Sequence, residues 1–272
     1  MPDSGSPVFA TYSNMADRYD DEGNVKSCWW EHTDKNVRSI VLKESYRTVA
    51  DIGCGTGAQL HQLANKAPRS MQFFGVEPAE NMRRRAVELN RPLVNVRVLE
   101  GSFEHIPLDD ASIDYLYSIN AFHWAADPGQ GLDEVKRVMR PGGEMDHFFI
   151  GRDIGREFIR ATTPIFMRYM GPKALLAAAR MRTQFTKDGA AEFFGGKFGA
   201  ARVHVEEVYE TYYDTVDGHL GWWVRIEPQL LAIPPEKKDA CDRDVHAALA
   251  ALDRGKGVPY TMHQIHVRVR LG

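Results

Sequence analysis

The stretch VADIGCGTGAQL, residues 49–60, places three glycines within five residues, directly after an acidic residue. Residues 48–52 predict a strand, and the spacing of Leu60, Leu63 and Ala64 predicts a helix immediately after the glycines. A strand that turns straight into a helix presents the free N–H groups of the first helical turn. Glycines let a ligand approach that backbone closely. The stretch therefore predicts a ligand-binding turn at the end of a strand.

The residues around the glycines narrow the choice of ligand. A phosphate-binding P-loop needs Lys followed by Ser or Thr after its last glycine, whereas Ala58 and Gln59 follow here. The dinucleotide fingerprint is G-x-G-x-x-G, but these glycines stand at 53, 55 and 57. Asp51 would repel a pyrophosphate and suit a cation. Glu77 ends the next predicted strand, where an acidic residue can accept both hydroxyls of a ribose. We expect a site for an adenosine-like ribose and a positive group, without phosphate.

Strand and helix patterns alternate through the first half of the chain. Further strands are predicted at 72–77, 95–101, 113–119 and 144–150, with helices from about 79 and at 131–139 and a break at RPGG, 140–143. Such alternation predicts a parallel, doubly wound α/β sheet. Two later alternating segments, 201–213 and 260–271, suit an antiparallel addition to that sheet.

The predicted elements divide the chain into one structural domain with a cap. Four segments are expected: an N-terminal helical lid (1–45), a core (46–150), a helical cap insertion (151–200), and the remaining strands (201–272) with a helical insertion at 214–258. The length of 272 residues is enough to bury a sizeable core.

Composition limits the kinds of partner and cellular location that we expect for this chain. The net charge of −3 and the sequence pI of about 6.4 give no basic balance for a nucleic acid. No apolar run approaches the roughly 18 residues of a membrane span, and the N-terminus lacks the pattern of a secretory signal. Three scattered cysteines without a CxxC favour neither disulfides nor zinc. We expect a cytoplasmic protein without a bound metal, a nucleic-acid partner or a membrane partner; the oligomeric state stays open.

Four motifs in order carry a family resemblance. VADIGCGTG, FGVEPAENM, GSFEHIPLDDASIDYLYSINAFHW and EVKRVMRPGGE, which cover roughly residues 48–145, together resemble the class I S-adenosylmethionine (SAM)-dependent methyltransferases. The resemblance implies a Rossmann-like, seven-stranded α/β sheet with helical cap insertions. It also implies SAM as the cofactor, with S-adenosylhomocysteine (SAH) as its product.

The resemblance implies cofactor contacts at individual positions. Asp51, Gly53 and Gly55 would line the methionine end, Gly57 would close the turn, and Glu77 would hold the ribose. The remaining implied contacts are Cys54, Pro78, Met82, Ser102, Phe103, Asn120 and Tyr12. Many relatives have an aspartate at the position of Ser102 or Phe103, and Glu104 is the acidic residue next to them here. Two of these residues have a plainer alternative, Met82 as core and Cys54 as a small turn residue.

The segment NAFHWAADP, 120–128, follows the fourth predicted strand, at the edge where open sheets bind ligands. Asn120, His123 and Tyr19 are the candidate catalytic residues. His123 either takes a proton near neutral pH or caps a loop, and Trp124 is either a wall of the acceptor site or core. The segment lacks the [ND]-P-P-[YF] arrangement of enzymes that methylate base amines, which argues against DNA or RNA as substrate.

Aromatic and basic residues elsewhere are candidates for the substrate site. Tyr12 and Tyr19 resemble tyrosines that close over the cofactor in small-molecule relatives, or they are a packed helix face. The candidate walls, or alternatively plain lid and cap core, are Trp29, Trp30, Trp222 and Trp223. Arg152, Arg156 and Arg160 at i, i+4 and i+8 predict one helical stripe. Such a stripe suits a carboxylate or diphosphate, or it is a solvated face. Asp146, in the fifth predicted strand, is expected to pair with one of these arginines or to sit at a strand end.

These observations predict a SAM-dependent methyltransferase that acts on a small metabolite. One hypothesis is an anionic and apolar acceptor such as a prenyl diphosphate, methylated at carbon in isoprenoid or secondary metabolism. The alternative is O- or C-methylation of a phenolic, quinone-like or carboxylate metabolite. Two further alternatives stay open, a SAM-binding protein without catalysis and an enzyme that methylates proteins.

Overall fold

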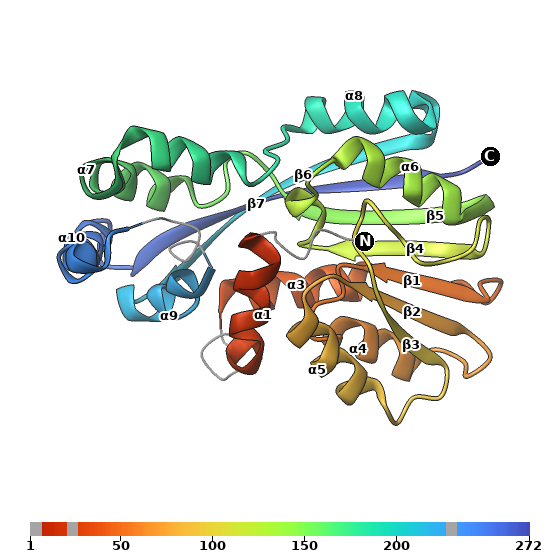
Figure 1. The fold of residues 1–272 in the computed structure, drawn as a ribbon. Coiled ribbons are helices and arrows are strands. Elements are labelled where there is room, and N and C mark those ends of the chain that lie inside the picture. The colour runs from red at the N-terminus through yellow and green to blue at the C-terminus, as the bar shows by residue number, and fades with distance from the viewer. Residues whose placement is uncertain (1–6, 21–26, 227–232) are drawn as a thin grey trace.

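A seven-stranded sheet organises the part of the chain that the computed structural model describes, residues 7–20, 27–226 and 233–272 (Figure 1). Its strands are β1 (Thr48–Ile52), β2 (Gln72–Glu77), β3 (Val96–Glu100), β4 (Ile113–Ile119), β5 (Met139–Ile150), β6 (Val203–Asp214) and β7 (Val258–Arg270). They lie in the order β3-β2-β1-β4-β5-β7-β6. β1 to β5 pair in parallel, and β7 pairs antiparallel with both β5 and β6. The predicted seven-stranded α/β sheet is confirmed.

Helices cover both faces of this sheet. They are α1 (Pro7–Tyr19), α3 (Cys28–Ser39), α4 (Ala58–Lys66), α5 (Glu80–Asn90), α6 (Pro128–Val138), α7 (Arg156–Arg180), α8 (Lys187–Phe198), α9 (Val216–Ile226) and α10 (Lys238–Ala250). Side chains alternate across a strand, so Ala50 and Ile52 of β1 pack with residues of α6 and α8. Val49 packs on the other face with residues of α3 and α4. In Figure 1, α6 and α8 lie together on the upper side.

A second hydrophobic core lies beyond the carboxyl ends of the parallel strands. The last residue of β5, Ile150, pairs with Gln264, so β7 extends past the end of β5. On this extension Tyr260 packs against Phe158 of α7 and Trp222 of α9, with ring centroids 5.1 and 4.8 Å away. α10 joins the same core, and the three helices gather around that end of β7 in Figure 1. The division of the chain into a core and a cap remains a prediction.

Two local predictions are wrong for backbone reasons. Residues 140–143 do not separate α6 from the strand but lie inside β5, because the register passes from Ile113–Met139 to Tyr115–Glu144 through an irregularity. The arginine stripe is broken as well. Arg152 lies in a turn, its N–H donating to the carbonyl of Phe185, and α7 begins only at Arg156.

Asp146 does not sit at a strand end but lies inside β5. It does not pair with an arginine of the following segment either. Its carboxylate accepts hydrogen bonds from the hydroxyl of Tyr115 at 2.7 Å and from Nε2 of His266 on β7 at 2.5 Å. These partners keep its pKa below the ordinary value, although burial works in the opposite direction. The unusual acidic residue in this strand is therefore part of a partly buried polar cluster that joins β4, β5 and β7.

Candidate functional site

The glycine turn has the left-handed backbone that only glycine adopts easily. Gly53, Gly55 and Gly57 have φ of 79°, 56° and 77°. The N–H of Gly53 donates to the carbonyl of Val76 at 2.8 Å, which fixes the end of β1 to β2. A Cβ on Gly57 would come within 2.9 Å of Cβ of Ala86 on α5, whereas a Cβ on Gly55 would meet nothing within 4 Å. Gly57 thus permits close packing of α5, and Gly55 faces open space.

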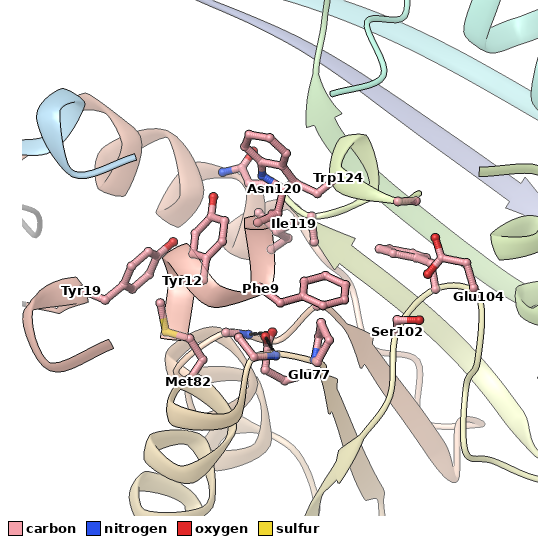
Figure 2. A pocket seen from close by; sticks show the side chains of 18 residues that line it. Phe9, Tyr12, Tyr19, Glu77, Met82, Ser102, Glu104, Ile119, Asn120 and Trp124 are labelled. Carbon is pink, nitrogen blue, oxygen red and sulfur yellow. Dashed lines mark hydrogen bonds between the residues drawn. The ribbon is translucent and has the colours of Figure 1, made fainter. Parts of the chain in front are cut away.

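That open space is part of a pocket of about 720 Å³, the first pocket, at the carboxyl edge of the sheet (Figure 2). It brings together the following residues predicted from the sequence: Tyr12, Tyr19, Gly53, Gly55, Glu77, Pro78, Met82, Ser102, Phe103, Glu104, Asn120 and Trp124. These residues come from α1, the glycine turn, and the segments that follow β2, β3 and β4. Residues far apart in sequence therefore meet around one cavity.

Glu77 is held at the wall of the first pocket by backbone N–H groups. Oε2 accepts from Gly55 at 2.9 Å, and Oε1 accepts from Ala79 at 2.8 Å, drawn as dashed lines in Figure 2. Burial raises the pKa of the Glu77 carboxyl to about 7, although both N–H groups lower it. A carboxylate offers about four acceptor positions. Two remain for hydroxyl groups of a ligand after the two N–H bonds are made.

Asp51 lies buried at the end of β1 and lines neither this pocket nor the one beside it. Burial, together with the charge of Glu77, raises the pKa of its carboxyl to about 8, although the hydroxyl of Tyr117 lowers it. A cation bound near the turn would favour the ionised forms of both carboxyls. Asp51 can thus act on such a ligand through its field, without being part of the pocket wall.

Helix α1 covers the first pocket. Phe9, Tyr12 and Tyr19 line it, with Phe9 and Tyr12 drawn above Glu77 in Figure 2. Two hydrogen bonds of 3.1 Å fasten this helix to α5, from the N–H of Asn81 to Oγ of Ser13 and from its Nδ2 to the Ser13 carbonyl. Phe9 was not predicted as a site residue, although it lies on the same helical face as the two tyrosines.

A second pocket of about 910 Å³ adjoins the first. Seven residues line both: Tyr12, Tyr19, Gly53, Gly55, Ile119, Asn120 and Trp124. The second pocket also contains Cys54, His123, Trp29, Trp30 and Trp222, all predicted for the site, and Thr33 and Arg182, which were not. The side chain of Trp223, the other predicted tryptophan, lies outside the described residues.

Asn120 stands where the two pockets meet. Its φ is +56°, a strained value for a residue other than glycine, and such strain tends to occur at functional sites. Its N–H donates to the carbonyl of Phe148 at 2.7 Å and its Nδ2 to Oγ1 of Thr33 at 3.1 Å. The side-chain oxygen Oδ1 is buried and accepts no hydrogen bond from the described residues. A polar acceptor is therefore available at the junction of the pockets.

Four buried ring nitrogens of the second pocket also lack hydrogen-bond partners among the described residues. They are Nε1 of Trp29, Trp124 and Trp222, and Nδ1 of His123. Buried polar groups are normally paired, and an unpaired one costs about 1–3 kcal/mol. Burial lowers the pKa of His123 well below 6.5, and the charge of Arg182 lowers it further. The imidazole is thus neutral at pH 7, and a ligand that carries several acceptor atoms would pair these groups.

Arg152 and Arg156, which were predicted to bind substrate, line neither the first nor the second pocket. Arg152 lines a third cavity, of about 1630 Å³, together with Arg182. Arg156 lines none of the three cavities; its Nε bonds Glu157 at 3.2 Å and its guanidinium lies 6.0 Å from the ring centre of Tyr209. Arg182 also belongs to the predicted cap segment 151–200, but local spacing gave no reason to select it. Only the fold brings it to the second pocket.

Two kinds of feature are absent from the described residues. In the described ranges, no three His, Cys, Asp or Glu side chains are grouped to hold a metal ion. None of the described helices has both the length and the apolar character required to cross a bilayer.

Comparisons with known proteins match the part of the chain that forms this site. A family model described as a methyltransferase domain matches residues 50–145. An uncharacterized methyltransferase of Mycobacterium tuberculosis is 30% identical over 154 residues, which are 54% of this chain and 60% of that protein. Trans-aconitate 2-methyltransferase of Deinococcus radiodurans is 30% identical over 109 residues, 40% of each. The chain thus spans less than two thirds of the length of these curated relatives.

The arrangement of the elements also has relatives among solved structures. A SAM-dependent methyltransferase from Thermotoga maritima superposes with a TM-score of 0.57 at 19% identity, covering 97% of this chain and 100% of that one. At this identity the likeness establishes the fold alone. The domain matched at residues 50–145, the methyltransferase relatives and this fold together support a class I SAM-dependent methyltransferase.

Proposed function

We propose that this protein transfers the methyl group of SAM to a small-molecule acceptor and releases SAH. The observation that carries the proposal is the Glu77 carboxylate, fixed by the N–H groups of Gly55 and Ala79 beside open space. Glu77 would accept the two ribose hydroxyls, and the backbone of Gly53 and Gly55 would receive the methionine end. The open face of Gly55 fits that group because a side chain there would fill the cradle.

The remaining wall of the first pocket fits a nucleoside. Pro78 and Met82 offer apolar surface beside the sugar, and Ser102 and Phe103 lie where the adenine would bind. Glu104 lines the same part, with its Oε1 accepting the N–H of Asp127 at 3.1 Å. A second oxygen of this carboxylate is available for the adenine amino group.

When bound, SAM supplies an electrophilic methyl group on a sulfonium. The chain has to align the acceptor with that group and exclude water, and alignment is worth roughly 7–11 kcal/mol. Tyr12 and Tyr19 of α1 cover the junction of the pockets, and Oδ1 of Asn120 positions the acceptor there. Burial raises the pKa of Tyr19 to about 12, so its phenol stays neutral. Neutral His123 would take the proton of an acidic hydroxyl or activated carbon.

The acceptor that we favour is anionic and apolar, such as a prenyl diphosphate methylated at carbon in isoprenoid or secondary metabolism. Arg182 and the four unpaired ring nitrogens of the second pocket support an acceptor rich in anionic oxygens. A phenolic, quinone-like or carboxylate metabolite is the second candidate. Neutral His123 and the likeness to a trans-aconitate methyltransferase support it. We also propose a cytoplasmic location, which the free thiols of Cys28, Cys54 and Cys241 support.

Calorimetry with SAH tests cofactor binding without knowledge of the acceptor. Glu77→Gln should weaken SAH binding at least tenfold, because a hydrogen bond to a charged group contributes about 1.5–3 kcal/mol. Glu80→Gln, at an exposed carboxylate of α5 that lines neither pocket, is the matched control. No heat of SAH binding to the wild type would refute the proposal. Incubation with labelled SAM and pooled metabolites would then identify the methylated product and distinguish catalysis from binding alone.

A further inference from the structure

The third cavity is a groove formed largely by the two halves of α7. At Gly171 the helix is interrupted by non-helical angles, φ 80° and ψ 167°, and Pro172 follows. The α7 groove is lined by one face of the first half, residues 159, 162, 163, 166 and 167, and by residues 172, 175, 176, 178 and 179 of the second. From residue 159 to 167 the helix rises about 12 Å. The groove is therefore long enough for an extended chain.

Apolar side chains in this groove are unusually exposed. Ile159, Met167 and Leu176, whose side chains would be expected in a core, are 45%, 43% and 53% exposed, and all three line the groove. Grouped apolar exposure of this kind marks binding surfaces rather than ordinary surface. The groove therefore offers apolar contacts that the described residues leave unfilled.

The charged residues that line the groove are two arginines. Arg152 and Arg182 line it, and no lining residue is acidic. Arg182 and Trp124 also line the second pocket, so the groove continues from the acceptor site. An arginine shared by a reaction site and an apolar groove, with a second arginine in the groove, matches a molecule with an anionic group between its reacting atom and an apolar chain.

We propose that the α7 groove binds the apolar chain of the methyl acceptor, with its anionic group at Arg152 and Arg182. The acceptor class is an amphiphile, a carboxylate or phosphate that carries an extended hydrocarbon or isoprenoid chain. This inference rests on the proposed function, because it treats the second pocket as the place of the reacting atom. Continuity of the groove with that pocket is what favours the acceptor over a second copy of the protein as its occupant.

The experiment measures chain-length dependence on the SAH-loaded wild-type protein by calorimetry. Two probe series are used, linear alkyl carboxylates and linear alkyl phosphates of increasing length. Each methylene that enters the groove should tighten binding about three- to fourfold, which corresponds to about 0.8 kcal/mol. The increase should stop once the chain fills the groove. The series that binds more tightly identifies the anionic group, and a flat response in both series would overturn the proposal.

Three variants separate the groove from general effects. Leu176→Glu places a charge in the groove at an exposed position, so folding is preserved and the chain-length dependence should be lost. Val94→Glu, at a residue 84% exposed and outside the groove, should leave the dependence intact. Arg182→Gln should weaken every member of a series by a similar factor. A Leu176→Glu protein that keeps the wild-type dependence would contradict the groove assignment.

Two further measurements distinguish a failure of the groove assignment from a failure of the proposed function. Sedimentation of the wild type and of Leu176→Glu tests whether a second copy of the protein occupies the groove. A wild-type dimer that dissociates in this variant, together with no chain-length dependence, would overturn the proposal in favour of a protein interface. SAH binding is measured first on each sample. A wild-type protein that does not bind SAH would refute the proposed function. A chain-length dependence measured without SAH would still support binding of an apolar chain in the α7 groove.

Discussion

Gly55 and Gly142 share a backbone conformation but differ in their surroundings. Their φ values are 56° and 78°, and a Cβ at either would meet nothing within 4 Å. Only Gly55 borders the first pocket. A comparison of the two positions therefore separates the cost of a left-handed backbone from the cost of filling the cradle.

Gly55→Ala and Gly142→Ala should each lower the free energy of unfolding by about 1–2 kcal/mol, because alanine is strained at positive φ. Only Gly55→Ala should also weaken SAH binding, since its methyl group occupies the ligand's space. Thermal unfolding and calorimetry on both variants make the test. Equal SAH affinity for the two variants would show that Gly55 does not touch the cofactor.

The carboxyls of Glu77 and Asp51 predict proton release when the cofactor binds. Burial raises their pKa values to about 7 and about 8, so both are largely protonated at pH 6. A sulfonium ligand favours the ionised forms. SAM affinity should therefore rise as the pH increases from 6 to about 8 and then level off.

Calorimetry at pH 6.5 in buffers of different ionisation enthalpy measures this release directly. Glu77→Gln should release fewer protons than the wild type, whereas Glu80→Gln should match it. Identical heats of SAM binding in all buffers would show that neither carboxyl changes its protonation.

The predicted site residues that the structure brings together are those whose position follows from local sequence. The glycines, Glu77 and Asn120 each follow a strand end directly, and the parallel sheet brings strand ends together. Arg182 and Thr33 could not be selected because their spacing is that of ordinary helical or loop residues. Their place at the second pocket depends on how α3 and the segment after α7 pack.

At the scale of elements, α1 is fastened to α5 by hydrogen bonds of Asn81 to Ser13. The side chain of Asn81 donates to the Ser13 carbonyl, yet Asn81 lines neither pocket. Asn81→Ala should speed SAH dissociation about fivefold, as expected for one hydrogen bond of about 1 kcal/mol. Gln62→Ala, which removes a bond from α4 to Asp34 of α3, is the control and should leave the rate unchanged. Stopped-flow tryptophan fluorescence measures both rates.

The strands were predictable to the extent that their pairing is regular. The predicted bounds 48–52, 72–77 and 113–119 agree with β1, β2 and β4. β5 is longer than predicted because its bulge admits a proline and two glycines, which normally end strands. The turn at Arg152 was missed because a backbone bond to Phe185, more than thirty positions along the chain, holds it.

At the scale of the whole molecule, the raised pKa values of Glu77 and Asp51 make stability depend on pH. Between the unfolded pKa of about 4 and the folded values of about 7 and 8, the folded state holds protons that the unfolded chain has lost. The contribution of these two carboxyls to the free energy of unfolding without cofactor should therefore fall as the pH rises through this window. One such group contributes about 1.4 kcal/mol per pH unit. Buried histidines with lowered pKa values act in the opposite direction below about pH 6.5: His32, His123, His147 and His219.

Urea unfolding at pH 5.5, 7 and 8.5 tests this dependence. Relative to Glu77→Gln, the wild type should lose free energy of unfolding between pH 5.5 and 7, because the histidines contribute equally in both proteins. Asp146 has a lowered pKa, so its contribution is lost only as the pH falls below about 4, outside the measured window. Parallel curves for wild type and variant would exclude a role for Glu77 in the pH dependence.

The two adjoining pockets share part of their lining. Tyr12, Gly55 and Asn120 are among the residues that line both. A nucleoside seated in one thus completes the surface of the other. The chain builds its second binding surface partly from its first ligand, and turnover should follow a compulsory order, with the methyl donor entering first and its demethylated product leaving last.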